Sequence, residues 1–261
     1  MSADFPMGSV WLVGAGPGDP ELLTRKAERL LQSADIVFYD ALVSQGVLDL
    51  IPESTPRQSV GKRAGRHSVP QPMICDIIVK AALKGQRVVR LKGGDPSIFG
   101  RANEELDACR EHGITAQICA GVTTASAAAA SLGTSLTTRG LARRVTFVTA
   151  HTTKGAAPEL EWATLADPEA TIAVYMGKSS ARHITQGLVS AGLSPETPAV
   201  VIENVSLPQE RAFHTRLATL PIAIKGATGA GPALILIGEA LRETTDKSAR
   251  ASASTRRFIA A

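Results

Sequence analysis

Cysteine and long apolar runs are both scarce in this 261-residue sequence, and each scarcity excludes a class of protein. The three cysteines are odd in number and lack the spacing of zinc ligands or of a disulfide framework, so we expect reduced thiols in a cytoplasmic protein. The strongly apolar run at Leu234–Ile237 is far shorter than the roughly 18 residues that span a membrane. The N-terminus, with Asp4, lacks the basic start and apolar stretch of a signal peptide. We therefore expect neither membrane insertion nor export.

Aromatic residues and net charge are also low, which argues against a nucleic-acid partner. Aromatics make up 4% of the chain, and the formal net charge of +4 is divided between the tail after Arg242 and the rest. Binding to single strands needs aromatic stacking platforms, and binding to duplexes needs a basic surface. The local cluster of Lys62, Arg63 and Arg66 is compatible with a small anionic ligand or with a solvated loop. The five histidines have no mutual ligand spacing, so we predict no metal site.

A regular alternation of short aliphatic runs with amphipathic stretches is typical of an α/β protein. The alternation is regular in the first half, whereas three runs come close together near the end of the second half. This predicts a mostly parallel sheet with helices first and a mixed sheet with helices second. The predicted strands lie near 10–13, 36–39, 58–60, 88–91, 116–119, 145–149, 172–175, 199–203, 213–217 and 233–237.

Changes in composition divide the chain into three parts. Ser135–Arg144 is short and polar and separates five strand-like runs from five more, so we place a domain boundary after residue 137. The stretch from Thr244 onward has no periodicity, which predicts a disordered basic tail. The expected parts are an N-terminal α/β domain at 1–137, a C-terminal α/β domain at 138–243 and the tail at 244–261. After the first strand, Asp19 as N-cap and Pro20 at the first helical position predict a helix.

Two glycine-rich loops follow predicted strands, and both end in Gly-Asp-Pro. They are Gly14–Pro20 and Lys92–Pro96. Glycines directly after a strand let the backbone approach a ligand closely, and open α/β sheets bind ligands at the carboxyl ends of their strands. We expect the loops to face one cleft, although each could equally be a tight turn whose Asp caps a helix.

The first loop partly matches a dinucleotide-binding fingerprint. Gly14 and Gly16 fit the opening of GxGxxG, and Asp40 lies about where a ribose-binding acid would be. The third glycine comes one residue too early, and a proline stiffens the turn where a pyrophosphate needs free backbone N–H groups. The loops therefore favour a neutral or cationic ligand. A nucleotide-dependent oxidoreductase and a ligand-binding module without catalysis remain alternatives from other classes.

Several ordered blocks together resemble one known family. They include the first glycine loop, the strand ending at Asp40, Val60–Gly65, the VRLKGGDPSIFGR block at Val89–Arg101, and Gly121–Ser126. In order and spacing they are similar to the tetrapyrrole methylases, over nearly all of the chain from Ser9 to Leu241. The resemblance implies two α/β domains with S-adenosylmethionine in the cleft between them, in a homodimer.

The resemblance also implies site residues. Asp40 would accept a proton and Lys62 would donate one, although Lys62 could equally bind carboxylates of the substrate. S-adenosylmethionine is a sulfonium with an amino-acid tail and a nucleoside, which suits apolar walls, backbone groups and an acid rather than phosphate donors. The implied cofactor contacts are Pro17, Gly93, Gly94, Asp95, Ile98, Thr123, Thr124, Met176, Val205 and Ala233.

The reaction that the resemblance implies is methylation of two carbon atoms of uroporphyrinogen III, which gives precorrin-2 for sirohaem or cobalamin. A pyrrole carbon would attack the methyl group in line, so the enzyme mainly orients the reactants in a dry site. Loss of a proton afterwards gives an acid–base group a role. Another S-adenosylmethionine-dependent methylase of the corrin pathway is the alternative within the class.

The sequence departs from the family's usual pattern at a few positions. None of the residues at these positions carries the proposed chemistry, although Val205 puts a side chain near a backbone contact to the cofactor. The departures are Ser97 for an aromatic residue, Ala102 and Asn103 for two glycines, Ala120 for proline, Thr138 for histidine and Val205 for glycine.

Overall fold

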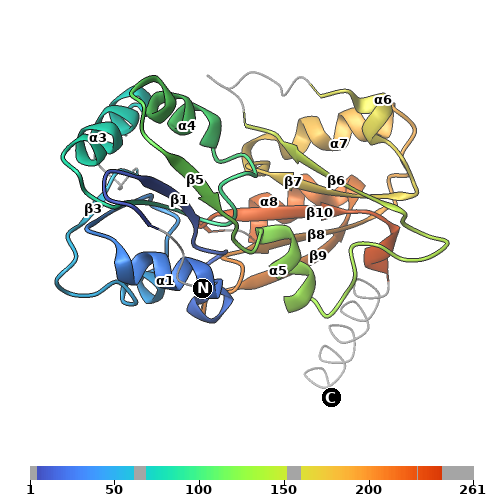
Figure 1. Cartoon of the computed structure of the whole chain (residues 1–261). Coiled ribbons are helices and arrows are strands. Elements are labelled where there is room, and N and C mark those ends of the chain that lie inside the picture. Colours follow the sequence, from blue (N-terminus) through green and yellow to red (C-terminus); the bar gives the residue numbers. More distant parts are fainter. Residues whose placement is uncertain (1–4, 62–68, 152–159, 228, 243–261) are drawn as a thin grey trace, which may run out of the picture. The chain divides into compact units, whose positions relative to one another are not determined.

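The computed structural model describes residues 5–61, 69–151, 160–227 and 229–242. The chain divides into two compact units, residues 1–124 and 125–261, and each contains a five-stranded sheet (Figure 1). The boundary that the sequence placed after residue 137 lies in the loop beyond helix α5 (Thr124–Ser131) and stays a prediction. The predicted tail at 244–261 lies outside the described residues.

The first sheet has the strand order β3-β2-β4-β1-β5, and its pairs are all parallel, as the sequence predicted. Strands β1 and β4 are buried at every position, and β1 accordingly reads as a continuous apolar run, whereas β4 buries Arg90 and Lys92 between its apolar residues. The five strands are β1 (Val10–Gly14), β2 (Ile36–Tyr39), β3 (Arg57–Ser59), β4 (Val88–Lys92) and β5 (Ala116–Cys119).

Helices cover both faces of this sheet (Figure 1). On one face α1 (Arg25–Ser33) and α2 (Gln45–Leu48) pack on side chains such as Val13 and Leu91. On the other face α3 (Gln71–Leu83) and α4 (Ala102–Glu111) cover residues such as Leu12 and Val88. Because alternate side chains of a strand point to opposite faces, β1 and β4 contribute to both cores.

The helix predicted from Pro20 is interrupted in the structure. Asp19 does act as a cap, because its carboxylate accepts from the backbone N–H of Glu21, but the turn it starts is a short 3₁₀ helix, η1 (Pro20–Leu22). Leu23 is extended, and α1 begins only after Thr24, whose hydroxyl accepts from the N–H of Ala27 at 3.1 Å. Two competing caps within one stretch therefore give two separate helical segments.

The second sheet is mixed, as predicted, with the order β6-β7-β10-β8-β9. Strands β6 and β7 are parallel, and the other pairs are antiparallel. The strands are β6 (Arg144–Thr149), β7 (Ala170–Tyr175), β8 (Pro198–Glu203), β9 (Arg211–Arg216) and β10 (Ala233–Ile237).

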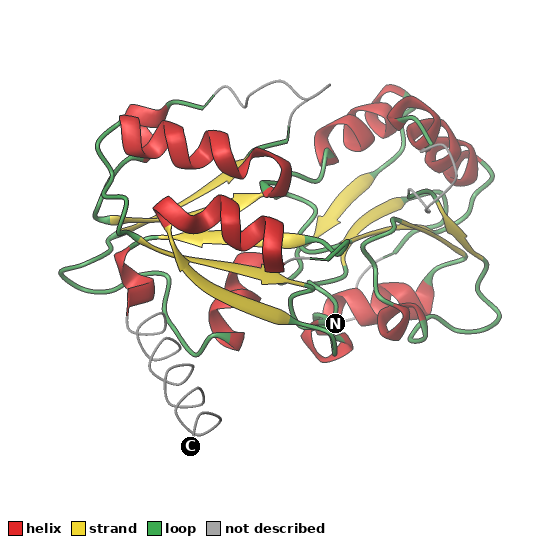
Figure 2. Ribbon diagram, turned by 180° about the vertical axis from the view of Figure 1, so that it is seen from behind, coloured by secondary structure: helices red, strands yellow, loops and turns green. Residues whose placement is uncertain are grey.

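Helices α7 (Ala181–Ser190) and α8 (Leu220–Ala227) pack on one face of the second sheet, which faces the viewer in Figure 2. Short α6 (Trp162–Leu165) lies against α7. Helix α5 also belongs to this unit, where the N–H of Ala125 donates to the hydroxyl of Tyr175 at 3.2 Å. The 3₁₀ turns η2 (Lys178–Ser180), η3 (Leu217–Thr219) and η4 (Glu239–Leu241) complete the unit. In the described part of the chain, no helix combines the length and apolar character that a membrane span requires.

Candidate functional site

The carboxyl ends of β1 and β4 lie side by side where the strand order of the first sheet reverses. After β1 the chain continues into α1 on one face of the sheet, and after β4 it continues into α4 on the other. Open α/β sheets bind ligands in the crevice at such a point. Both glycine loops found in the sequence therefore lie at the position where this type of sheet binds ligands.

The two glycine loops are joined directly by backbone hydrogen bonds. The N–H of Gly94 donates to the carbonyl of Gly16 at 2.7 Å, and the N–H of Gly16 donates back at 3.2 Å. Gly94 has a φ of +70°, which disfavours any other residue. A Cβ on Gly14 would lie 2.6 Å from the Cα of Gly121, so glycine is also required at position 14 for the close approach of these two backbone segments. The loops lie together, as the sequence led us to expect.

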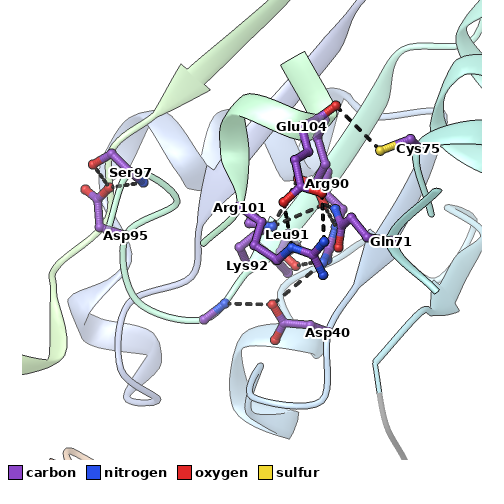
Figure 3. A network of polar contacts seen from close by, with 12 residues as sticks. Asp40, Gln71, Cys75, Arg90, Leu91, Lys92, Asp95, Ser97, Arg101 and Glu104 are labelled. Carbon is purple, nitrogen blue, oxygen red and sulfur yellow. Dashed lines mark hydrogen bonds and ion pairs between the residues drawn. The ribbon is translucent and has the colours of Figure 1, made fainter. Parts of the chain in front are cut away.

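Asp95 connects the loop after β4 to the loop after β5. Its Oδ1 accepts from the N–H of Ser97 at 2.7 Å and from the Ser97 hydroxyl (Figure 3), and its Oδ2 accepts from the N–H of Gly121 at 3.1 Å. A carboxylate has about four acceptor positions, so these three donors leave room for one more. Ser97, at a position where the family has an aromatic residue, thus donates two hydrogen bonds to Asp95, which is one of the residues predicted to contact the cofactor.

Asp40 lies at the end of β2 and reaches the second glycine loop. Its Oδ1 accepts from the N–H of Leu42 at 2.9 Å, and its Oδ2 accepts from the N–H of Gly93 at 3.3 Å. The Nη2 of Arg90 lies 3.9 Å from the same Oδ2 (Figure 3). The side chain is 23% exposed, so it keeps access to solvent. The structure thereby brings the predicted proton acceptor into contact with a predicted cofactor residue.

The other expected residues of the first unit lie in the same loops. Pro17 is half-buried in the first loop, and Ile98 is half-buried with its N–H donating to the carbonyl of Asp95 at 3.1 Å. Thr123 and Thr124 follow β5, and a Cβ built on Gly94 would lie 3.8 Å from the Thr124 hydroxyl. The structure therefore gathers these residues around the switch point of the first sheet.

Lys62, the predicted proton donor, lies outside the described residues, as do Arg63 and Arg66. The residue before it, Gly61, is described. A Cβ on Gly61 would lie 2.1 Å from the backbone nitrogen of Ala41 and 2.8 Å from the carbonyl carbon of Asp40. Gly61, the residue before Lys62, is therefore in close contact with the turn at Asp40 and Ala41.

The remaining expected residues lie at the end of the second sheet where the central strands β7 and β8 finish and β10 begins. Strand β10 is antiparallel to both β7 and β8, so its start at Ala233 lies beside the ends of those strands. Met176 follows β7 and is 47% exposed, with a φ of +54°. Such a backbone is strained for a residue other than glycine, and residues of this kind are enriched at functional sites. Val205 follows β8 at the same end of the sheet.

Val205 occupies a position where the family usually has glycine. The positive φ values fall on its neighbours, Asn204 at +56° and Ser206 at +61°, whereas Val205 itself is not among the residues with positive φ. Its side chain is 4% exposed. The turn therefore accommodates a β-branched residue without backbone strain at that position, although its side chain adds volume beside the turn.

A buried carboxylate fixes the loop that leads into β10. Glu203 is 1% exposed and accepts from Lys178 Nζ at 3.2 Å, Arg211 Nη2 at 2.6 Å and the N–H of Gly229 at 3.0 Å. Burial alone would raise the pKa of Glu203, but these three donors prevail and lower it to about 2. Lys178 also donates to the carbonyl of Gly231 at 2.9 Å. The clamp therefore holds the chain just before Ala233.

A buried ionic cluster that was not predicted from the sequence lies behind Asp40. Arg90 and Lys92 both pair with Glu105 of α4 on the α3/α4 face of the first sheet. The available signal was two basic residues, two positions apart, in an otherwise apolar strand, because such residues point to the same face and need an anion there.

Among the described residues, no group of three or more His, Cys, Asp or Glu side chains is arranged to hold a metal ion.

Comparison with known proteins gives concordant matches. The family model for tetrapyrrole (corrin/porphyrin) methylases matches residues 9–221. A uroporphyrinogen-III C-methyltransferase from Paracoccus denitrificans is 45% identical over 89% of this chain and 81% of its own length. A siroheme synthase from Nitrosospira multiformis is 44% identical over 89% of this chain, but this chain spans about half of that relative's length (49%).

Solved structures agree with this result. A uroporphyrin-III C-methyltransferase from Thermus thermophilus, in complex with S-adenosylhomocysteine, is 39% identical with a TM-score of 0.76, over 90% of this chain and 99% of its own. A cobalt precorrin-4 methyltransferase is 30% identical with a TM-score of 0.79, over 92% of this chain and 99% of its own. Because the family model covers most of the chain and the aligned sequences share well over a third of their residues with the first two relatives, this chain belongs to the tetrapyrrole methylase family.

Proposed function

We propose that this chain is an S-adenosylmethionine-dependent C-methyltransferase that methylates uroporphyrinogen III twice and gives precorrin-2. The similarity to the Paracoccus enzyme, over most of both chains, supports this activity. The structural observation that carries it is the joined pair of glycine loops at the switch point, with the Asp95 carboxylate tied beneath them. The siroheme synthases are about twice as long, so the proposal covers methylation alone.

The residues around the switch point fit S-adenosylmethionine. Glycine backbone at Gly93 and Gly94 permits close approach, Asp95 retains one acceptor position for an amine or hydroxyl, and half-buried Ile98 offers an apolar wall. When bound, the cofactor supplies an electrophilic methyl group. We assign its contacts to the loop residues named above in the first unit, and to Met176, Val205 and Ala233 in the second.

In this proposal Asp40 accepts the proton that the macrocycle loses after methylation. The backbone N–H groups of Leu42 and Gly93, together with Arg90, hold the carboxylate of Asp40 in place. Because the side chain is partly exposed, the lone pairs that face solvent stay accessible to a proton. Lys62 donates a proton or binds a substrate carboxylate. The contact of Gly61 with the Asp40 turn supports a place for Lys62 near this carboxylate.

The quaternary structure and the cellular location belong to the same proposal. Like the family it belongs to, the chain forms a homodimer that works in the cytoplasm on a small tetrapyrrole. Sedimentation equilibrium of the purified protein measures the assembly directly. A monomer at micromolar concentration would contradict the dimer without affecting the assigned reaction.

The experiment that tests the activity is methyl transfer under anaerobic conditions. With uroporphyrinogen III and methyl-labelled S-adenosylmethionine, we expect two labels per macrocycle and a singly methylated intermediate. The affinity for the substrate should fall with added salt, because exposed charge pairs are screened over about 8 Å at physiological ionic strength. Labelling of another corrin precursor but not of uroporphyrinogen III would keep the family and overturn the substrate. Tight binding of a nicotinamide dinucleotide without S-adenosylmethionine binding would overturn the enzyme class.

A further inference from the structure

Two cations are buried in the centre of the first sheet. Arg90 and Lys92 alternate with the apolar residues of β4, so both side chains point toward α3 and α4. Their side chains are 4% and 6% exposed. Because burial of a charge is costly unless the charge is paired, the cluster needs anions in direct contact.

Glu105 of α4 is the anion at the centre of this cluster, and its side chain is fully buried. It accepts from Arg90 Nε at 3.1 Å, from Lys92 Nζ at 3.1 and 3.0 Å, and from Gln71 Nε2 at 3.1 Å. Two cations thus face one anion. Burial, followed by the charge of Arg90, lowers the pKa of Lys92 although Glu105 acts in the opposite direction.

Arg90 extends from Glu105 to Asp40. Its Nε bonds to Glu105, its Nη1 donates to the carbonyl of Leu91 at 2.9 Å, and its Nη2 lies 3.9 Å from Asp40 Oδ2. That oxygen also accepts from the N–H of Gly93. A planar guanidinium held at two other points cannot follow a moving carboxylate. The position of Arg90 therefore determines where the carboxylate of Asp40 is most stable.

We propose that Arg90, held by Glu105, is a positioning residue that keeps Asp40 Oδ2 against the Gly93 turn and leaves the outer lone pairs of Asp40 to take the proton. This inference rests on the proposed role of Asp40. The charges agree with it, because Asp40 is the second anion that balances the two buried cations. Glu105 acts one step further back, since it fixes the guanidinium without touching Asp40.

The test uses Arg90→Met, Arg90→Lys and a matched control. Arg90→Met leaves Lys92 and Glu105 paired one to one, so it creates no unpaired buried charge. Arg90→Lys keeps the charge but loses the planar fork. The control is Arg87→Met, which removes an Arg–carboxylate pair with Asp35, at 2.8 Å, beyond the opposite end of β4.

The first measurement needs no substrate. We expect amide hydrogen exchange at Gly93 to be faster by about tenfold in Arg90→Met, because the carboxylate that accepts its hydrogen bond is released, and to be unchanged in Arg87→Met. Unchanged exchange at Gly93 in Arg90→Met would overturn the inference. Should Arg90→Met fail to fold, Arg90→Lys serves in its place with a smaller expected change in the same direction.

The second measurement is a double-mutant cycle on turnover. Arg90→Met should lower kcat by about tenfold while the Kd for S-adenosylmethionine stays within a few-fold, and Arg90→Lys should recover part of the loss. In the Asp40→Asn background Arg90→Met should cost nothing further. An equal loss in both backgrounds would show that Arg90 does not act through Asp40. If the wild type transfers no label to uroporphyrinogen III, the proposed function fails, and the exchange at Gly93 still decides whether Arg90 holds Asp40.

Discussion

The amide and carbonyl of Gly94 both bond to Gly16 across the two loops, and its φ of +70° lies in the left-handed region that favours glycine. Gly94→Val should therefore abolish binding of S-adenosylmethionine, measured by isothermal titration calorimetry, because a branched side chain enters the space of the ligand. Gly113→Val is the matched control. Gly113 has a φ of +67° with no other atom within 4 Å of an added Cβ.

Both valine variants carry the same kind of backbone strain, about 1 to 3 kcal/mol. A similar loss of stability in the two, with binding lost only in Gly94→Val, separates the effect on the site from the effect on the fold. Normal cofactor affinity in a folded Gly94→Val protein would show that the assignment of this loop is wrong.

Asp40→Asn tests the proton acceptor. Asparagine keeps the size of the side chain but binds a proton far more weakly, so we expect kcat for label transfer to fall by roughly 10² or more. Affinity for the cofactor should stay within a few-fold. Asp76→Asn, at an exposed position of α3, is the control and should leave turnover unchanged. Unchanged turnover in Asp40→Asn would leave Asp40 as a structural residue.

At this scale the sequence predicts residues whose chemistry depends on neighbours along the chain. The glycines and Asp95 follow strands directly, so their place at a sheet edge follows from local pattern. The bond between Ser97 and Asp95 is local, but the bond from Asp95 to Gly121 joins separate elements. The pairing of Arg90 with Glu105 likewise depends on how α4 packs on β4, which no local pattern specifies.

Helix α7 meets α6 at a glycine. A Cβ on Gly187 would lie 2.3 Å from the ring of Trp162, so the indole packs directly on the backbone of α7. Gly187→Ala should destabilise the protein by about 1 to 3 kcal/mol, because overpacking outweighs the roughly 1 kcal/mol that alanine gains over glycine in a helix.

Gly226 in α8 supplies the opposite case, because an added Cβ meets nothing within 4 Å. Gly226→Ala should leave stability unchanged or raise it by up to about 1 kcal/mol. Urea unfolding of both variants measures the difference. A stabilised Gly187→Ala protein would contradict the contact between Trp162 and α7.

The strands were the most predictable elements, since each predicted run overlaps a strand whose ends differ by at most two residues. Buried strands such as β1 and β10 are short apolar runs bounded by turn residues, which is a local signal. The helix after β1 was less predictable. Both Asp19 and Thr24 are good caps, and the sequence does not tell which one starts the longer helix.

Acid should destabilise the chain partly through Glu203. Its folded pKa of about 2 lies below the reference value of 4.5, so its contribution is complete above pH 4.5 and is lost as the pH falls toward 2. The Tm difference between wild type and Glu203→Gln should therefore be large at pH 6 and smaller at pH 3. Glu196→Gln, which alters an exposed pair with Arg216, is the control and should change Tm little at either pH. A gap that does not shrink in acid would contradict the role of the Glu203 charge.

At the scale of the whole molecule, the sequence predicts two α/β units, a parallel sheet and a mixed sheet. The order of the strands in each sheet could not be predicted from the sequence, because an apolar segment does not indicate which other strand it will pair with. The placement of β4 between β2 and β1 is what makes the switch point, and with it the contact between the two glycine loops.

The same strand order has a consequence for synthesis on the ribosome. Strand β1 pairs with β4 and β5 and not with β2, so a nascent chain that ends before Val88 contains β1 without either of its neighbours. During that interval the apolar residues of β1 have no sheet to join, whereas β2 and β3 can already pair. An unpaired apolar strand is prone to aggregation. From this strand order we expect the nascent chain to be more prone to aggregation before β4 is made than after it.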